Sequence, residues 1–163
     1  MRADHAQSVL VFELANRAYF AASISDRGDD YFRRFTVLFD ELLAAQEAGE
    51  GAYYLLVAAD GSVVGRFNLE FSGDGTAKLG YRVAEHAAGQ GVATATVQEI
   101  CRLASEQHGV RVLRAATSLS NVASQRVLLK SGFVPVGPAD PRDVGGKLGT
   151  WYERELVPPG GTS

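Results

Sequence analysis

The chain has 163 residues with 19 acidic and 16 basic side chains, and its net charge of -3 disfavours a nucleic acid or an anionic membrane as a partner held by bulk electrostatics. Hydrophobic residues make up 46% and charged residues 21%, a globular composition that argues against disorder and fits one ordinary domain. One cysteine cannot form an intrachain disulfide, no Cys/His spacing resembles a zinc site, and no apolar run approaches the ~20 residues that cross a membrane.

The first third of the chain predicts helices. Apolar residues at mixed helical spacing indicate one or two short helices over 6–22, and 23–30 reads as a loop. Residues 31–48 repeat apolar side chains every 3.6 residues, which predicts one amphipathic helix. Gly49 and Gly51 suit its C-terminal cap.

Three strands follow and predict an antiparallel meander over 53–59, 62–71 and 76–84. Asp60-Gly61 between the first two is a hairpin turn signal. In the second strand Phe67, Leu69 and Phe71 share one face, and Arg66, Asn68 and Glu70 share the other.

The second half alternates helices with strands. The predicted order is a loop over 85–91, a helix over 92–108, a strand over 112–118, a helix over 121–131, a strand over 133–137, a loop over 138–146 and a strand over 150–157. Hairpins combined with a strand–helix–strand crossover predict an α+β domain around one mixed sheet. No repeat or linker marks a boundary, so we expect a single domain over 1–157 and a flexible tail over 158–163.

The segment AAGQGVAT (87–94) lies between a strand and a helix and indicates an anion site. Gly89 and Gly91 permit backbone conformations that bring N–H groups close to a ligand, and the helix N-terminus adds unpaired N–H groups and its dipole. A plain glycine turn before a helix explains the segment equally well. Two better-known phosphate motifs fail, because no lysine follows Gly91 and because Thr94 stands where a dinucleotide fingerprint needs Gly or Ala.

A second segment, NVASQRVLLKSGF (121–133), has the residues of an ordinary capped helix. Asn121 suits the N-cap, Ser124 lies three residues on, and Gly132 suits the C-terminal cap. Each residue therefore has a purely structural explanation.

Taken together, these segments resemble the GCN5-related N-acetyltransferases (GNAT family). The carrying motifs are LGYRV (79–83), GQGVAT (89–94) and NVASQRVLLKSGF (121–133), and ELANRAYF (13–20) is similar to the branch of ribosomal-protein N-terminal acetyltransferases. The resemblance covers roughly residues 6–157. It implies a GNAT-like mixed, mostly antiparallel sheet flanked by helices, in which a splayed strand pair binds acetyl-CoA.

The resemblance also implies where acetyl-CoA would bind, with no metal. Backbone groups near Val83 would pair with the pantetheine arm, the glycine loop would wrap the pyrophosphate, and the helix start would contact the pantetheine or the acetyl end. The implied cofactor-binding residues are Tyr81, Arg82, Val83, Gly89, Gln90, Gly91, Val92, Ala93, Thr94, Asn121 and Ser124.

The sequence departs from the family pattern at two places. Ala88 stands where an Arg or Gln usually contacts the phosphate, and Gln90 is a partial substitute. The family usually opens with a full strand, whereas only residues 1–3 precede the first helix here. We therefore expect either a truncated sheet edge or a start that lies too late.

The implied reaction is attack of an amine on the thioester carbonyl, with a backbone N–H near Val83 as the donor to the developing oxyanion. Glu70 is the predicted base, directly or through water, although a solvated carboxylate is an equally ordinary role for it. Ser124 is predicted to lie near the leaving thiolate, because no tyrosine occurs between Asn121 and Phe133. Glu13, Arg17 and Tyr19 are expected on the acceptor side.

The sequence thus predicts a cytoplasmic, acetyl-CoA-dependent N-acetyltransferase acting on a primary amine, either a protein N-terminus or a small molecule. The expected partners are acetyl-CoA and the acceptor, without nucleic acid or membrane, in a monomer or homodimer. The alternative is a non-catalytic acyl-CoA-binding or regulatory module, which the Ala88 departure favours. A domain without any ligand is the third possibility.

Overall fold

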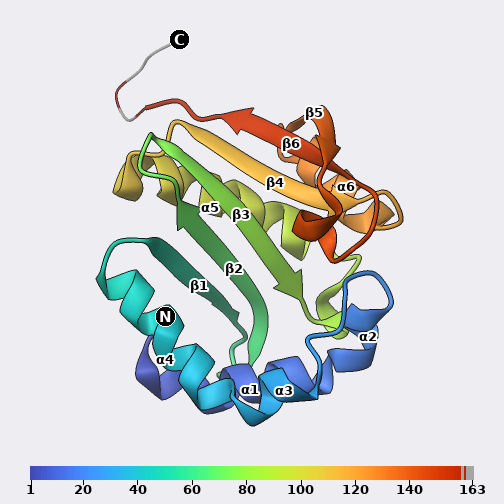
Figure 1. Ribbon diagram of the computed structural model, residues 1–163. Helices are drawn as coiled ribbons and strands as arrows, with labels where there is room; N and C mark the ends of the chain where they lie inside the picture. Colours follow the sequence, from blue (N-terminus) through green and yellow to red (C-terminus); the bar gives the residue numbers. More distant parts are fainter. Residues whose placement is uncertain (159, 161–163) are drawn as a thin grey trace.

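The computed structural model describes residues 1–158 and 160, and its strands form one mixed sheet in the order β1-β2-β3-β4-β6-β5 (Figure 1). The strands are β1 (Gly51–Val57), β2 (Val63–Phe71), β3 (Thr76–Val83), β4 (Val112–Ser118), β5 (Val134–Ala139) and β6 (Gly149–Glu155). The α-helices are α1 (Ala6–Ala15), α2 (Arg17–Ala21), α3 (Asp29–Arg33), α4 (Phe35–Glu47), α5 (Val92–His108) and α6 (Val122–Lys130), and short 3-10 turns cover Ala3–His5, Glu85–Ala87 and Pro141–Val144. The mixed α+β sheet is confirmed. The predicted tail lies mostly outside the described residues.

The sheet divides into two halves at its centre. β3 and β4 run parallel, but their ladder covers only Thr76–Lys78 against Val112–Arg114. Beyond it β3 keeps its pairing with β2 as far as Val83, and β4 keeps its pairing with β6 as far as Ser118. The two strands therefore separate toward their carboxyl ends, and we call this opening the splay.

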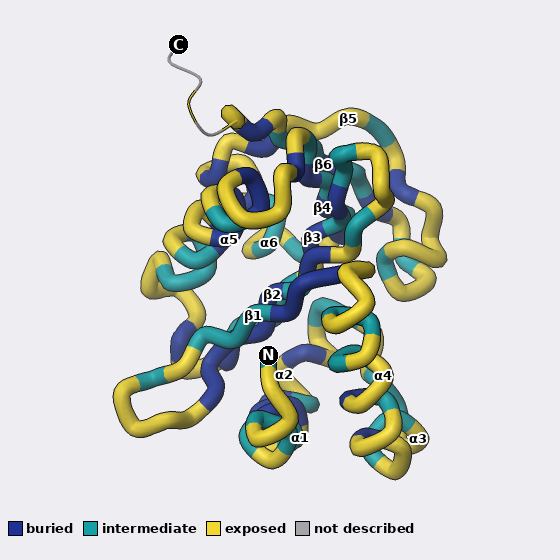
Figure 2. The backbone as a smooth tube through the Cα atoms, turned by 90° about the vertical axis from the view of Figure 1, so that its left-hand side faces the viewer, coloured by how far each residue is buried: buried dark blue, intermediate teal, exposed yellow. Residues whose placement is uncertain are grey.

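Helices cover both faces of the sheet. Phe67 and Leu69 of β2 pack with α5 and α6 in the larger core, as the alternation along β2 predicts. The opposite face is covered by α1 to α4, whose Val9, Phe12 and Phe39 form a second core cluster (Figure 2). The splay thus lies between two rigid, packed layers.

The structure differs from the sequence prediction in several local features, and Gly51, expected in the cap of the helix over 31–48, instead begins β1. The expected helix over 31–48 is two helices, α3 and α4, which meet at Arg34. The strand expected over 133–137 extends to Ala139. The polar face of β2 is partly buried, since α1 covers Arg66, which is 4% exposed. None of the described helices is both long enough and apolar enough to cross a membrane.

Candidate active site

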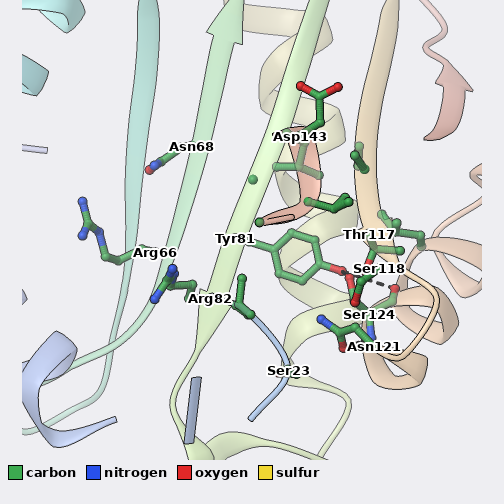
Figure 3. A pocket seen from close by; sticks show the side chains of 18 of the residues that line it. Ser23, Arg66, Asn68, Tyr81, Arg82, Thr117, Ser118, Asn121, Ser124 and Asp143 are labelled. Atoms are coloured by element: carbon green, nitrogen blue, oxygen red, sulfur yellow. Dashed lines mark hydrogen bonds between the residues drawn. The ribbon is translucent and has the colours of Figure 1, made fainter. Parts of the chain in front are cut away.

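Two cavities meet at the splay. One, of about 250 Å³, lies between β3 and the end of β4, and we call it the splay cavity (Figure 3). The other, of about 340 Å³, extends from the same point to the loop before α5, and we call it the glycine-loop cavity. Both are lined by Ser23, Ile24, Tyr81, Arg82, Asn121 and Ser124. Ligands that fill the two cavities would therefore meet at these residues.

The glycine loop has the backbone of an anion cradle. Gly89 and Gly91 have φ of +73° and +74°, and a Cβ added at either would meet no atom within 4 Å. Ala95 is the first α5 residue whose N–H bonds to a preceding carbonyl, that of Gly91. Within the described part of the chain, the first-turn N–H groups of α5 thus remain without acceptors. Such a terminus fits a phosphate, so the loop suits the pyrophosphate of acetyl-CoA.

Not every residue predicted for this loop faces the cavity. Gly89, Gly91, Ala93 and Thr94 line it, as do Ala88 and Val83. Gln90 and Val92 do not, and the Gln90 amide instead donates to the His86 carbonyl at 3.0 Å. A phosphate contact from Gln90 would need that bond to break.

Two cations that the sequence analysis missed lie on the same cavity. Arg126 and Lys130 project from exposed positions of α6 and line it together with Ala88. Arg126 and Lys130 are four residues apart and therefore lie on the same face of α6, next to Ala123 and Val127, which line the same cavity. This helical spacing is the sequence signal that would have identified them. They provide positive charge where position 88 provides none.

Tyr81 brings a hydroxyl into the splay from β3. Its Oη lies 3.0 Å from the Ser124 Oγ, and its ring stacks on Phe67 at a centroid distance of 5.7 Å. Asn121 caps α6, because its Oδ1 accepts from the Ser124 N–H at 3.2 Å. Burial raises the pKa of Tyr81 to about 12, although the Ser124 hydrogen bond opposes that rise. The phenol therefore stays protonated and can donate.

The residues predicted for the acceptor side are scattered. Glu70 is exposed, pairs across the sheet with Gly51 and Lys78, and lines neither cavity, so its role as the base stays a prediction. Tyr19 lines the glycine-loop cavity. Arg17 binds two exposed carboxylates away from both cavities, those of Asp26 and Asp29.

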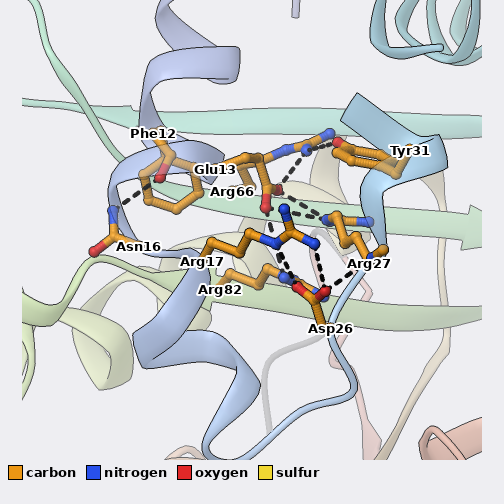
Figure 4. A network of polar contacts seen from close by, with 10 residues as sticks. Phe12, Glu13, Asn16, Arg17, Asp26, Arg27, Tyr31, Arg66 and Arg82 are labelled. Carbon is orange, nitrogen blue, oxygen red and sulfur yellow. Dashed lines mark hydrogen bonds and ion pairs between the residues drawn. The ribbon is translucent and has the colours of Figure 1, made fainter. Parts of the chain in front are cut away.

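Glu13 lies behind the splay cavity at the centre of an arginine cluster (Figure 4). Its side chain is 1% exposed and accepts from Arg27 twice at 3.0 Å and from Arg66 Nη1 at 2.7 Å, with Arg82 Nη1 at 3.5 Å. Burial would raise the pKa of Glu13, but the three guanidinium groups outweigh it and hold that pKa below its usual range. Glu13 is thus a fixed carboxylate and a poor proton acceptor.

The arginines of the cluster line the splay cavity, together with Asn68, Thr117, Ser118 and Asp143. Among the described residues there is no group of three or more His, Cys, Asp or Glu side chains that could hold a metal ion. The side chains that line the cavity offer hydroxyl, amide, guanidinium and carboxylate groups.

The sheet separates at its parallel strand pair, and an open glycine loop lies beside the separation. This combination is typical of transferases that use acyl-CoA, and the comparison with protein-family sequences agrees. Residues 2–134 match the acetyltransferase (GNAT) domain. The chain belongs to this family, and the resemblance drawn from the sequence motifs is confirmed.

Solved structures with the same fold include two ribosomal-protein acetyltransferases and a third protein, RimJ. The ribosomal-protein-S5-alanine acetyltransferase of Vibrio fischeri has a TM-score of 0.85 at 16% identity over 95% of this chain and 90% of its own. The enzyme of Salmonella typhimurium that modifies the N-terminal serine of L7/L12 has a TM-score of 0.81 at 17% identity over 94% and 91%. RimJ of Mycobacterium smegmatis, solved with CoA-disulfide, has a TM-score of 0.80 at 20% identity over 95% and 79%. No curated protein matches this chain.

Proposed function

We propose that this GNAT-family chain transfers an acetyl group from acetyl-CoA to the α-amino group of a protein N-terminus. The observation that carries the proposal is the meeting of two cavities at one pair of hydroxyl groups, Tyr81 and Ser124. The glycine-loop cavity suits the phosphates of the cofactor, and the splay cavity would receive its acyl end together with the acceptor amine. Two of the structural neighbours described above are named as acetyltransferases of ribosomal proteins, which supports this class of acceptor.

The residues at the meeting point divide the work. The α5 N-terminus with Arg126 and Lys130 holds the phosphates. Tyr81, with its proton held at neutral pH, donates to the leaving sulfur directly or through Ser124. The edge of β3 from Leu79 to Val83 has no partner on β4, so its backbone groups are free to pair with the pantetheine arm and the thioester carbonyl. Acetyl-CoA supplies the activated acyl group.

The lining of the splay cavity favours an α-amine. A lysine side chain has a pKa near 10.4 and needs a strong base, whereas a peptide α-amine has a pKa of about 7.7–8.0 and is partly neutral at pH 7. Glu13 is unsuited to proton removal, and Glu70 lies outside the cavity. An acceptor that is already partly deprotonated needs only water to take its proton, and positioning supplies much of the rate.

A non-catalytic acyl-CoA-binding module is the second candidate, and Ala88 is the observation that favours it. Such a module would need only the glycine-loop cavity. The polar lining of the splay cavity and the paired hydroxyl groups favour the enzyme.

The test is an acetylation assay on a panel of peptides with free N-termini, read out by release of free thiol and by peptide mass. We expect acetylation at the α-amine, and none of the same peptides with blocked N-termini. If acetyl-CoA binds in calorimetry and no free peptide or other amine is acetylated, the binding module is correct.

A further inference from the structure

The arginine cluster contains more positive charges than are needed to neutralise the buried carboxylate at its centre. Three guanidinium groups, those of Arg27, Arg66 and Arg82, surround the one carboxylate of Glu13. A buried carboxylate needs one partner of opposite charge, and burying an excess of charge is costly unless the charge has a use. The excess also acts on the arginines themselves: burial, followed by the repulsion of Arg27, lowers the pKa of Arg82 to about 10.

All three arginines retain unused hydrogen-bond donors, because a guanidinium group carries five N–H donors. Arg27 uses two of them on Glu13 and lies over the Tyr31 ring at 4.5 Å. Arg66 is 4% exposed, and its Nε is buried without any partner. The Arg82 guanidinium makes no hydrogen bond within the described part of the chain; it lies 3.5 Å from Glu13 and over the Phe20 ring at 5.1 Å, and the side chain is 16% exposed. Unpaired buried donors are rare in native proteins, and each calls for an explanation such as a bound water, ion or partner.

Arg66 and Arg82 both border the splay cavity, and apart from Glu13 no carboxylate of the described residues pairs with them. Asp143 is the carboxylate on its lining, and it is exposed, on the 3-10 turn across the splay. Asp26 and Asp29 are held by Arg17. The cavity therefore has a positive wall formed by β2 and β3, with Asn68 beside it.

Arg82 also lines the glycine-loop cavity, so its guanidinium lies near the point where the two cavities meet. In β3 the side chains of Tyr81 and Arg82 point to opposite faces of the sheet. Tyr81 faces Ser124, while Arg82 faces the helices that cover the other side (Figure 3). An anion bound by Arg82 would thus lie close to, but separate from, the reacting amine.

We propose that the acceptor carries a carboxylate close to its amine, bound by the Arg82 guanidinium and attracted by the charge of Arg66 and Arg27 beside it, so that the enzyme prefers N-termini whose second residue is acidic. This inference rests on the proposed function and specifies the substrate of the same site. Glu13 and Tyr31 hold the Arg66 guanidinium in place, and Glu13 and the Phe20 ring border that of Arg82, so little side-chain entropy is lost on binding.

The test compares three peptides that are identical except for Asp, Asn or Lys at the second position, at saturating acetyl-CoA. For the wild type we expect kcat/KM to be about 10- to 100-fold higher with Asp than with Asn, the range for a lost charged hydrogen bond, and lower still with Lys. In Arg82→Gln the Asp/Asn ratio should fall toward 1, and Arg82→Lys should restore part of it. Arg33→Gln, which removes an exposed charge outside both cavities, should keep the wild-type ratio.

Equal rates on the Asp and Asn peptides in the wild type would overturn the inference while leaving the proposed function intact, and this comparison does not depend on any variant folding. A ratio that survives in a folded Arg82→Gln would also overturn it. If no free peptide is acetylated at all, the proposed function itself is wrong and the inference falls with it. A merely structural role for Arg82 would change the melting temperature without changing the ratio between peptides.

Discussion

Tyr81 shows how a hydroxyl can come from an unexpected element. The absence of tyrosine from 121–133 left Ser124 as the predicted group near the thiolate. In the structure the two hydroxyl groups lie 3.0 Å apart, one on a strand and one on a helix. Strand pairing places Tyr81 beside Phe67, and the N-cap of Asn121 fixes the first turn that carries Ser124. A single sequence cannot show this contact because it joins residues 43 positions apart.

Removal of this pair should slow the chemical step and leave cofactor binding intact. Tyr81→Phe is expected to lower kcat about 10²-fold, within the range for loss of an acid catalyst, with acetyl-CoA affinity within about twofold. Ser124→Ala should act through the same contact, so the double variant should cost little more than the worse single one. Because the pKa of Tyr81 is about 12, the wild-type kcat should show no fall from Tyr81 ionisation between pH 8 and 11. Steady-state kinetics over that pH range measure kcat, and calorimetry measures the affinity for acetyl-CoA. If the losses of kcat in the two single variants add up in the double variant, the two hydroxyl groups act separately.

Glu13 should matter for stability more than for proton transfer. Glu13→Gln leaves three arginines without their buried counter-charge, and breaking such a pair costs about 3–5 kcal/mol. The native pKa of Glu13 lies below its unfolded value near 4.5, so its stabilisation is present above that pH and is lost as pH falls through the native value. Urea unfolding between pH 7 and 3 should show a lower free energy for the variant at pH 7 and a smaller decline on acidification.

The exposed Glu41→Gln on α4 is the matched control and should follow the wild type at every pH. A Glu13→Gln protein as stable as the wild type at pH 7 would mean that the arginines need no counter-charge.

At the scale of the elements, the sequence predicts best where the local signals are complete. α5 and β4 have the predicted bounds, because glycine marks both ends of the helix and alternation marks the strand. The helix expected over 31–48 fails at Arg34. Its apolar period runs on through the break, because Phe35 and Phe39 are buried in the core cluster and Tyr31 packs against that same cluster, while its hydroxyl accepts from Arg66. Periodicity reports which side chains are apolar, and it does not report where the backbone helix is interrupted.

The residues of the candidate site also differ in how well the sequence predicts their positions. The glycine loop, Asn121 and Ser124 could be placed from sequence because their spacing is local. The burial of Arg66 could not, since the carboxylate that neutralises it is 53 residues away on α1. The same reasoning put Glu70 with Arg66 and Asn68 on one face of β2, which is correct for strand parity, but the cavity ends before Glu70.

The two ends of α5 provide a matched test of the anion cradle. Gly91 and Gly109 both have left-handed backbones, with φ of +74° and +64°, and a Cβ would meet no atom at either. Alanine at each should cost a similar stability of about 1–3 kcal/mol. A saturating ligand at 100 times its Kd stabilises by about 2.7 kcal/mol. We expect acetyl-CoA to stabilise the wild type and Gly109→Ala in this way, and not to stabilise Gly91→Ala. Thermal melting with and without acetyl-CoA measures this. Equal shifts of the melting temperature in the two variants would show that the cofactor does not bind at this loop.

At the scale of the whole molecule, the sheet is two halves joined by a three-residue ladder. The strands within β1–β2–β3 and within β4–β6–β5 pair along most of their length, and α5 packs in the core that the two halves share. Such a joint leaves backbone groups of both central strands exposed to whatever fills the splay.

Acetyl-CoA binding should therefore slow hydrogen exchange selectively. We expect protection to increase in 79–83 of β3 and 115–118 of β4, the segments that lack a mutual ladder. The amides of 67–69 in β2, where the strand pairs on both sides, are the internal control and should not change. Mass-spectrometric exchange measures this directly, and protection confined to the glycine loop would mean that the ligand does not enter the splay.

The position of the glycine-loop cavity also affects how readily the spent cofactor is released after each turnover. Its loop, its α6 cations and the free edge of β3 would all hold parts of the cofactor that acetyl transfer does not alter. Acetylated and spent cofactor differ only at the end near Tyr81 and Ser124. The protein therefore has few contacts with which to tell them apart, and the spent form should remain bound with nearly the affinity of the fresh one. Product inhibition follows, competitive with acetyl-CoA, so turnover in a cell would depend on the ratio of the two cofactor forms as well as on the amount of either.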